Sequence, residues 1–205
     1  MKWFLPLLLV GNLFQQDKLV ISREQKTNLR KILRILASYD IKYGQFWTPL
    51  DESKPIKMDC SGTTQYIYKT VLGISLPRTS YDQYLAVKNS GNLQEPPKTI
   101  DGKIDIDKLR AMLKTGDLLF WINTHSDIPK DRNPPVGHVM IYLGRDKLGV
   151  MKAGGANTFG RGEKVLKGGV DIFTFDPNQK IGCVKDNTGR CKLESEFIGF
   201  GRPGR

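Results

Sequence analysis

One cysteine and one histidine of this chain are candidates for a nucleophile and its base. Cys60 lies in Met58–Gly62, directly before a segment of helical character, and the unpaired N–H groups at a helix start stabilise a thiolate. His138 lies in Val136–Gly144, whose strand pattern can hold an imidazole rigidly against a neighbouring helix end. Thiol and imidazole together carry out acyl transfer. From residue types alone, the alternative is a buried structural cysteine and a hydrogen-bonded core histidine.

Two helices are expected around this pair. Ser22 followed by Gln25 is typical of a capping box, and apolar residues then recur at helical spacing, which predicts an amphipathic helix over about residues 23–38. The opposite face of this helix is basic and has no interleaved aromatic residue, so we interpret it as solvated. Its cations are Arg23, Lys26, Arg30, Lys31 and Arg34. A second helix is expected over residues 61–72, with Gly73 as its left-handed C-terminal residue.

The second half of the chain is rich in short β-like segments. Strands are expected at residues 117–122, 136–143, 148–153, 170–175 and 196–200. Helices followed by strands indicate an α+β fold in which N-terminal helices pack on a central antiparallel sheet. We interpret the polar tract over about residues 88–108 as an insertion within one domain, and residues 130–135 as a second loop.

The N-terminus resembles a secretory signal peptide. Lys2 precedes an apolar run over residues 3–14, which is shorter than the roughly 20 residues that span a membrane. We therefore expect residues 1–16 to be a signal peptide and residues 17–205 to form one domain, exported to the periplasm or the extracellular space. The segment lacks a small-x-small cleavage site, so a buried N-terminal strand is the alternative.

Export gives a meaning to the remaining two cysteines. Cys183 and Cys191 bracket the turn-forming residues 186–189, and an oxidising compartment would let them form a disulfide across a hairpin. Cys60 would then be the one free thiol, as a nucleophile requires. Two free thiols in a surface loop are the alternative.

The charge of the chain favours anionic partners. Its 32 Lys and Arg against 21 Asp and Glu give a net charge of +11, which attracts nucleic acid, anionic lipid or acidic wall polymers. A solvated basic surface with no specific partner is the alternative. No nucleic-acid partner is expected, because no reading motif accompanies the charge. Metal-ligand spacing is missing, and Gly154-Gly155 is too short for a phosphate loop, so no metal or cofactor is expected.

Four blocks in order carry a family resemblance. Residues 59–68, 72–83, 113–121 and 137–144 resemble the signature blocks of the NlpC-type cell-wall peptidases, and the similarity extends over about residues 24–202. The resemblance implies a small papain-like domain that cleaves bacterial peptidoglycan peptides, commonly at the bond after D-glutamate. The order of cysteine before histidine argues against the circularly permuted relatives that act on lipids.

The resemblance also implies roles for five residues. Cys60 matches the family nucleophile and His138 its general base, while Tyr43 matches a tyrosine whose hydroxyl points into the site. Asp59 and Ser61 match positions that in some members hold the amine and the carboxylate of the peptide. For both, the alternative is a role at the helix start alone.

The third catalytic position departs from the family. There a His, Asn or Gln orients the base from the next strand, at about residues 150–153, where this chain has Lys152. A lysine ammonium has no acceptor for the Nδ1–H of His138. We prefer Asn157 as the orienting residue; a backbone carbonyl, or a dyad with no third residue, is the alternative.

The leading hypothesis is a secreted, monomeric cysteine hydrolase of peptidoglycan peptides without stable membrane insertion. Lys152 supports a second hypothesis, a wall-binding protein that has lost turnover. A third is an exported antibacterial toxin with the same chemistry, whose partner would be an immunity protein.

Overall fold

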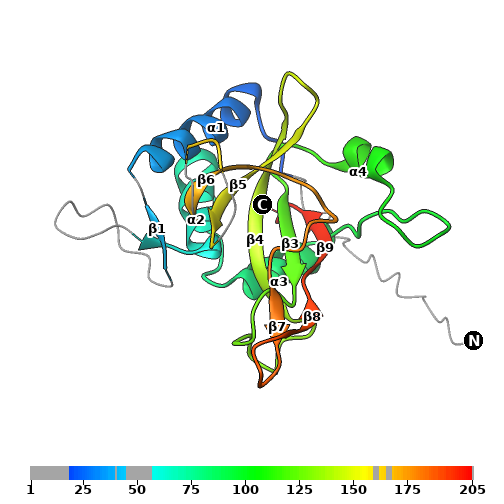
Figure 1. The fold of residues 1–205 in the computed structure, drawn as a ribbon. Helices are drawn as coiled ribbons and strands as arrows, with labels where there is room; N and C mark the ends of the chain where they lie inside the picture. Colours follow the sequence, from blue (N-terminus) through cyan, green and yellow to red (C-terminus); the bar gives the residue numbers. More distant parts are fainter. Residues whose placement is uncertain (1–18, 40, 45–56, 159–161, 165–167, 205) are drawn as a thin grey trace, which may run out of the picture.

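A computed structural model describes residues 19–39, 41–44, 57–158, 162–164 and 168–204 of the chain. Its centre is a five-stranded sheet in the order β6-β5-β4-β3-β9, and all neighbouring strands are antiparallel (Figure 1). The strands are β3 (Leu118–Ile122), β4 (Val136–Arg145), β5 (Met151–Asn157), β6 (Gly169–Thr174) and β9 (Glu196–Gly201). The expected α+β fold, helices on a central antiparallel sheet, is confirmed.

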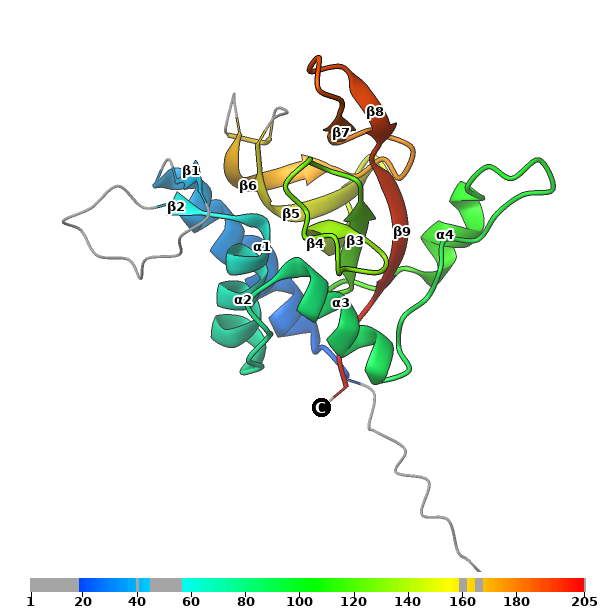
Figure 2. The ribbon, with the colours of Figure 1, turned by 90° about the horizontal axis from the view of Figure 1, so that it is seen from below.

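Three helices cover one face of this sheet, as Figure 2 shows. They are α1 (Arg23–Ser38), α2 (Cys60–Ile67) and α3 (Ser80–Asn89). A π-helical turn over Tyr68–Leu72 continues α2. A further helix, α4 (Ile106–Met112), buries its Leu109 in the apolar cluster on the other face.

Strand β3 shows how both faces of the sheet come to be packed. Leu118 and Phe120 belong to the cluster beneath the helices, whereas Leu119 and Trp121 belong to the opposite cluster. Successive side chains of a strand point to opposite faces, so a wholly apolar strand needs cover on both. Truncating a buried Phe or Trp at such a position typically costs about 3–5 kcal/mol. The central strands, which carry part of the site, are therefore packed on both faces.

Two short pairings complete the fold. Strand β1 (Lys42–Tyr43) runs parallel to β2 (Lys57–Met58). Strands β7 (Cys183–Lys185) and β8 (Cys191–Glu194) form a hairpin closed by the Cys183–Cys191 disulfide, with their Cα atoms 5.6 Å apart. The predicted turn is present, because Gly189 donates to the carbonyl of Asp186.

The helix predictions were accurate where local signals are strong. Ser22 and Gln25 form the expected capping box at the start of α1. The second helix starts one residue earlier than predicted, at Cys60, and Gly73 ends it with a φ of 71°. The tract over residues 88–108 is less irregular than expected, since α3 ends and α4 begins within it.

The strand predicted at residues 148–153 was wrong in its bounds. The Asp146 carboxylate accepts hydrogen bonds from the backbone N–H groups of Leu148 and Val150, which makes these residues a turn. Strand β5 begins after this turn and continues to Asn157. Its course requires Gly154, because a Cβ there would lie 2.1 Å from the Leu33 Cδ1 of α1.

The predicted signal peptide, residues 1–16, lies outside the described residues. Within the part of the chain that is described, no helix has the length and apolar character to cross a membrane.

Candidate active site

Cys60 is the first residue of α2, where the helix meets the sheet. The N-cap Asp59 accepts a hydrogen bond from the Gly62 N–H at 2.6 Å, which satisfies one of the free donors of the first turn. The thiol is 4% exposed and receives a hydrogen bond from the backbone of Val139 in β4. The cap and the sheet thus fix the thiol in position.

The surroundings of Cys60 favour its neutral form, in contrast to the thiolate that its place at a helix start predicts. Burial, followed by the charge of Asp59, raises the pKa of the Cys60 thiol. Hydrogen bonds from Val139, Tyr43 and Ser61 oppose this by lowering the same pKa. Since the raising effects prevail, the resting group is a thiol, which becomes a strong nucleophile only when a base takes its proton.

Tyr43 reaches the thiol from β1. Its hydroxyl hydrogen-bonds with Cys60, and burial, with the neighbouring Cys60 next, raises the pKa of Tyr43. The phenol therefore stays protonated and can donate to sulfur or to a bound substrate. The Tyr43 hydroxyl therefore lies beside the candidate nucleophile.

His138 is a buried imidazole on β4. It lies opposite Trp121 of β3, with ring centroids 5.7 Å apart, and it is 6% exposed. Burial, followed by the proximity of His125, lowers the pKa of His138 to about 4. The ring is neutral at neutral pH, as a general base must be.

One pocket joins all the residues predicted for the site. Its volume is about 700 Å³. Its lining includes Tyr43, Asp59, Cys60, Ser61, His138 and Asn157. The candidate nucleophile and base and the candidate orienting and binding residues thus share one space, although they come from β1, α2, β4 and β5.

The structure separates the two candidates for the third position. Ile141 of β4 lies opposite Gly154 of β5. Because the two strands are antiparallel, His138, three residues before Ile141, and Asn157, three residues after Gly154, lie toward the same end of the pair. Lys152 lies opposite Gly144, at the other end of β4. Its ammonium is 3.5 Å from the Asp146 carboxylate, and it does not line the pocket.

The imidazole has one buried nitrogen without a hydrogen-bond partner in the described part of the chain. Nε2 of His138, rather than the expected Nδ1, is buried without a hydrogen-bond partner among the described residues. The Oδ1 of Asn157 accepts from the Thr158 N–H at 2.8 Å, and no hydrogen bond joins Asn157 to His138 in this conformation. An amide oxygen has two lone pairs, so Oδ1 has capacity for a second donor.

Arg78 is a pocket residue that sequence reasoning missed. Its guanidinium donates to both oxygens of Asp59, at 3.1 and 2.7 Å, and to the Ser61 hydroxyl at 3.0 Å. The side chain is 42% exposed and lines the pocket. Arg78 stood within a family-like block, but only the fold shows that it contacts residues 17 and 19 positions earlier.

The loop between β3 and β4 forms a wall of the same pocket. Thr124, His125 and Asp127 line the pocket from this loop. Gly137 lets the loop come close, since a Cβ there would lie 2.3 Å from the Thr124 hydroxyl. The hairpin β7–β8 supports the loop, because the Lys185 N–H donates to the Ser126 hydroxyl at 2.9 Å.

The chemistry of this site agrees with a comparison with known families. Among the described residues, no cluster of His, Cys, Asp and Glu could hold a metal ion, and a thiol–imidazole pair needs none. The NlpC/P60 family matches residues 47–155, slightly more than half of the chain. The chain belongs to the NlpC/P60 family. Both Cys60 and His138 lie within the matched segment.

Members of the NlpC/P60 family are typically cysteine peptidases, generally of cell-wall peptidoglycan. The family thus suggests a peptidoglycan substrate and export to the wall, and the Cys183–Cys191 disulfide is consistent with an oxidising compartment. No curated protein matches the chain.

Proposed function

We propose that this chain is an exported cysteine endopeptidase that hydrolyses an amide bond of peptidoglycan peptides, at the bond after D-glutamate. The observation that carries the proposal is the shared pocket of Cys60, at the N-terminus of α2, and His138, on β4. The NlpC/P60 membership supports the substrate class.

The reaction follows from the protonation states of the pair. Neutral His138 takes the proton of the Cys60 thiol as sulfur attacks the amide carbonyl carbon. Backbone N–H groups at the start of α2 stabilise the resulting oxyanion. His138 then donates the proton to the leaving amine, and an acyl-enzyme forms. Water, deprotonated by His138, attacks the thioester, which releases the carboxylate and restores the thiol.

Asn157 is proposed to orient the imidazole by accepting from Nε2–H. Its place beside His138 on the neighbouring strand supports this role, which requires the two side chains to move together until Oδ1 accepts Nε2–H as a second donor. Lys152 lies at the other end of β4 from His138, which supports an active enzyme over the alternative of a wall-binding protein without turnover.

Arg78 and Ser61 supply the donors for a substrate carboxylate, and Tyr43 borders the reacting thiol. The guanidinium already donates two parallel hydrogen bonds to Asp59, so it would attract a substrate carboxylate through its positive charge. Asp59 holds Arg78 in place and provides the negative charge for a substrate amine. A peptide with a free amine and a free carboxylate therefore fits the pocket.

The test is to incubate purified protein with muropeptides and to identify the products by mass. Wild-type protein is expected to cleave, and Cys60→Ala to be inactive. The variant should lose at most about 1–2 kcal/mol of stability, because the thiol contributes little packing. Cys60→Ser is the size-matched control for that loss. Turnover by Cys60→Ala would refute the nucleophile assignment.

A further inference from the structure

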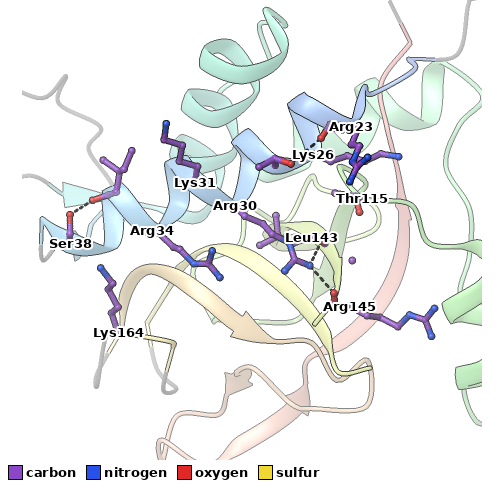
Figure 3. A pocket seen from close by; sticks show the side chains of 13 residues that line it. Arg23, Lys26, Arg30, Lys31, Arg34, Ser38, Thr115, Leu143, Arg145 and Lys164 are labelled. Carbon is purple, nitrogen blue, oxygen red and sulfur yellow. Dashed lines mark hydrogen bonds between the residues drawn. The ribbon is translucent and has the colours of Figure 1, made fainter. Parts of the chain in front are cut away.

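A second hollow lies on the side of α1 that faces the end of β4 (Figure 3). Its volume is about 730 Å³. The basic face of α1 forms one wall, and the end of β4 with Thr115 forms the other. The cations that line it are Arg23, Lys26, Arg30, Lys31, Arg34, Arg145 and Lys164. We call this hollow the basic groove.

Most of the positive charge in the basic groove is uncompensated. Arg23, Lys26, Arg145 and Lys164 form no ion pair with the described residues. Arg34 is 3.4 Å from the carboxylate of an exposed glutamate, in a weak, solvated pair. Like charges held close together raise the energy of the empty groove, and an anion would lower it.

Arg30 is fixed in place while its charge stays available. Its guanidinium donates to the carbonyl of Leu143 at 2.7 Å and to that of Arg145 at 3.0 Å. Carbonyl oxygens carry no net charge, so they order the side chain without neutralising it. Figure 3 shows these two bonds linking α1 to the end of β4.

The cations repeat along the groove. Arg23, Lys26, Arg30 and Arg34 are spaced by three or four residues, which places them on one face of α1, about one per 5.4 Å turn. The row extends over roughly 16 Å at 1.5 Å per residue. A linear anion with regularly spaced charges matches this row better than a single compact anion does.

The side chains that line the basic groove favour some kinds of polyanion over others. The described lining residues include no aromatic side chain on which a nucleic-acid base could stack. Its apolar side chains, Ile35 and Leu143, are too few to insert into a bilayer, and Leu143 is only 1% exposed. Arginine outnumbers lysine, and its guanidinium suits phosphate oxygens.

We propose that the basic groove binds one strand of a base-free phosphodiester polymer of the cell wall. The choice of a wall polymer rests on the proposed function, whereas binding itself needs no hydrolysis. The groove is distinct from the catalytic pocket, because His138 and Arg145 are seven residues apart on β4, roughly 23 Å at 3.3 Å per residue. The basic face of α1 is thus more than a solvated surface.

The experiment measures binding of the full chain to poly(glycerol phosphate) by titration at several salt concentrations. The groove variant Arg23→Gln/Lys26→Gln/Arg145→Gln is compared with Lys88→Gln/Lys98→Gln/Lys192→Gln, which removes three exposed charges elsewhere. We expect the groove variant to bind at least about tenfold more weakly than the wild type. The slope of log affinity against log salt concentration should become smaller by about 2, because each of the three lost phosphate contacts contributes about 0.7. The control should lose less than threefold, and both should cleave soluble muropeptides as the wild type does.

Three results would overturn the proposal. The first is equal loss in both variants, which would show a general charge effect. The second is tighter binding to single-stranded DNA with the same number of phosphates. The third is tighter binding to vesicles of equal parts phosphatidylglycerol and phosphatidylcholine. Failure of muropeptide cleavage with groove binding intact would refute only the proposed function.

Discussion

Two replacements of Asp59 together distinguish its role as a helix cap from a role that needs its negative charge. In Asp59→Ala, the buried Gly62 N–H loses its acceptor, at a cost of about 1–3 kcal/mol. The lost pair with Arg78 adds about 0.2–1 kcal/mol, because the guanidinium is 42% exposed and screened by water. Asp59→Asn keeps a capping oxygen and loses the charge, so its stability should fall by less than about 1 kcal/mol.

The two variants are compared by urea denaturation and by kcat/KM on muropeptides. If the charge holds Arg78 or a substrate amine, Asp59→Asn should lose about 10- to 100-fold in kcat/KM, equivalent to about 1.5–3 kcal/mol for a charge-assisted hydrogen bond. Ser22→Ala is the matched control, since Ser22 caps α1 away from the pocket. It should lose about 1 kcal/mol of stability and no activity.

Wild-type kcat/KM in Asp59→Asn would refute this reasoning and leave Asp59 as a cap alone. Equal stability of Asp59→Ala and wild type would refute the energetic estimate. A substrate with an acetylated N-terminus separates the two charged roles. If Asp59 binds the amine, blocking the amine should remove most of the difference between Asp59→Asn and wild type.

Three further predictions concern the base, its orientation and the hairpin. The pKa of His138 is about 4 in the folded protein and about 6.5 in the unfolded chain. Between these pH values only the unfolded chain binds the proton, so the wild type should lose roughly 3 kcal/mol of stability as the pH falls from 6.5 to 4. Urea denaturation at pH 7 and 4.5 should show a smaller loss for His138→Asn, and an equal loss would contradict the assignment. Asn157→Ala should lower kcat at least about tenfold and Lys152→Ala should not, with the reverse result arguing for Lys152. Thiol titration of denatured, unreduced protein should find one thiol, whereas three would exclude the Cys183–Cys191 disulfide.

The helices show which parts of the fold could be predicted from sequence. Helix α1 has both a capping box and a regular apolar stripe, so its bounds follow from local chemistry. Helix α3 lacks that stripe because two of its buried residues, Ser80 and Gln83, are polar. Gln83 hydrogen-bonds with Thr64 and with the carbonyl of Ser61 in α2, contacts that no periodicity reveals.

The site shows the same division between local and tertiary information. Cys60 and His138 stand in strong local patterns and were predicted from sequence, and they lie in one pocket. The distinction between Asn157 and Lys152 depends on the strand register, which the turn at Asp146 displaced from its expected place. The contact of Arg78 with Asp59 depends on the packing of α2 against the segment before α3.

The two chain segments at the base of the hairpin β7–β8 are hydrogen-bonded to each other; we call this base the neck. The Ser195 N–H donates to the carbonyl of Gly182, and the Ile181 N–H donates to the Ser195 hydroxyl, so the chain enters and leaves at one point. Insertions or deletions beyond this neck need not disturb the sheet. Since the hairpin supports the pocket wall at Ser126, changes in the hairpin can alter that wall while β4 and β5, which carry His138 and Asn157, stay unchanged.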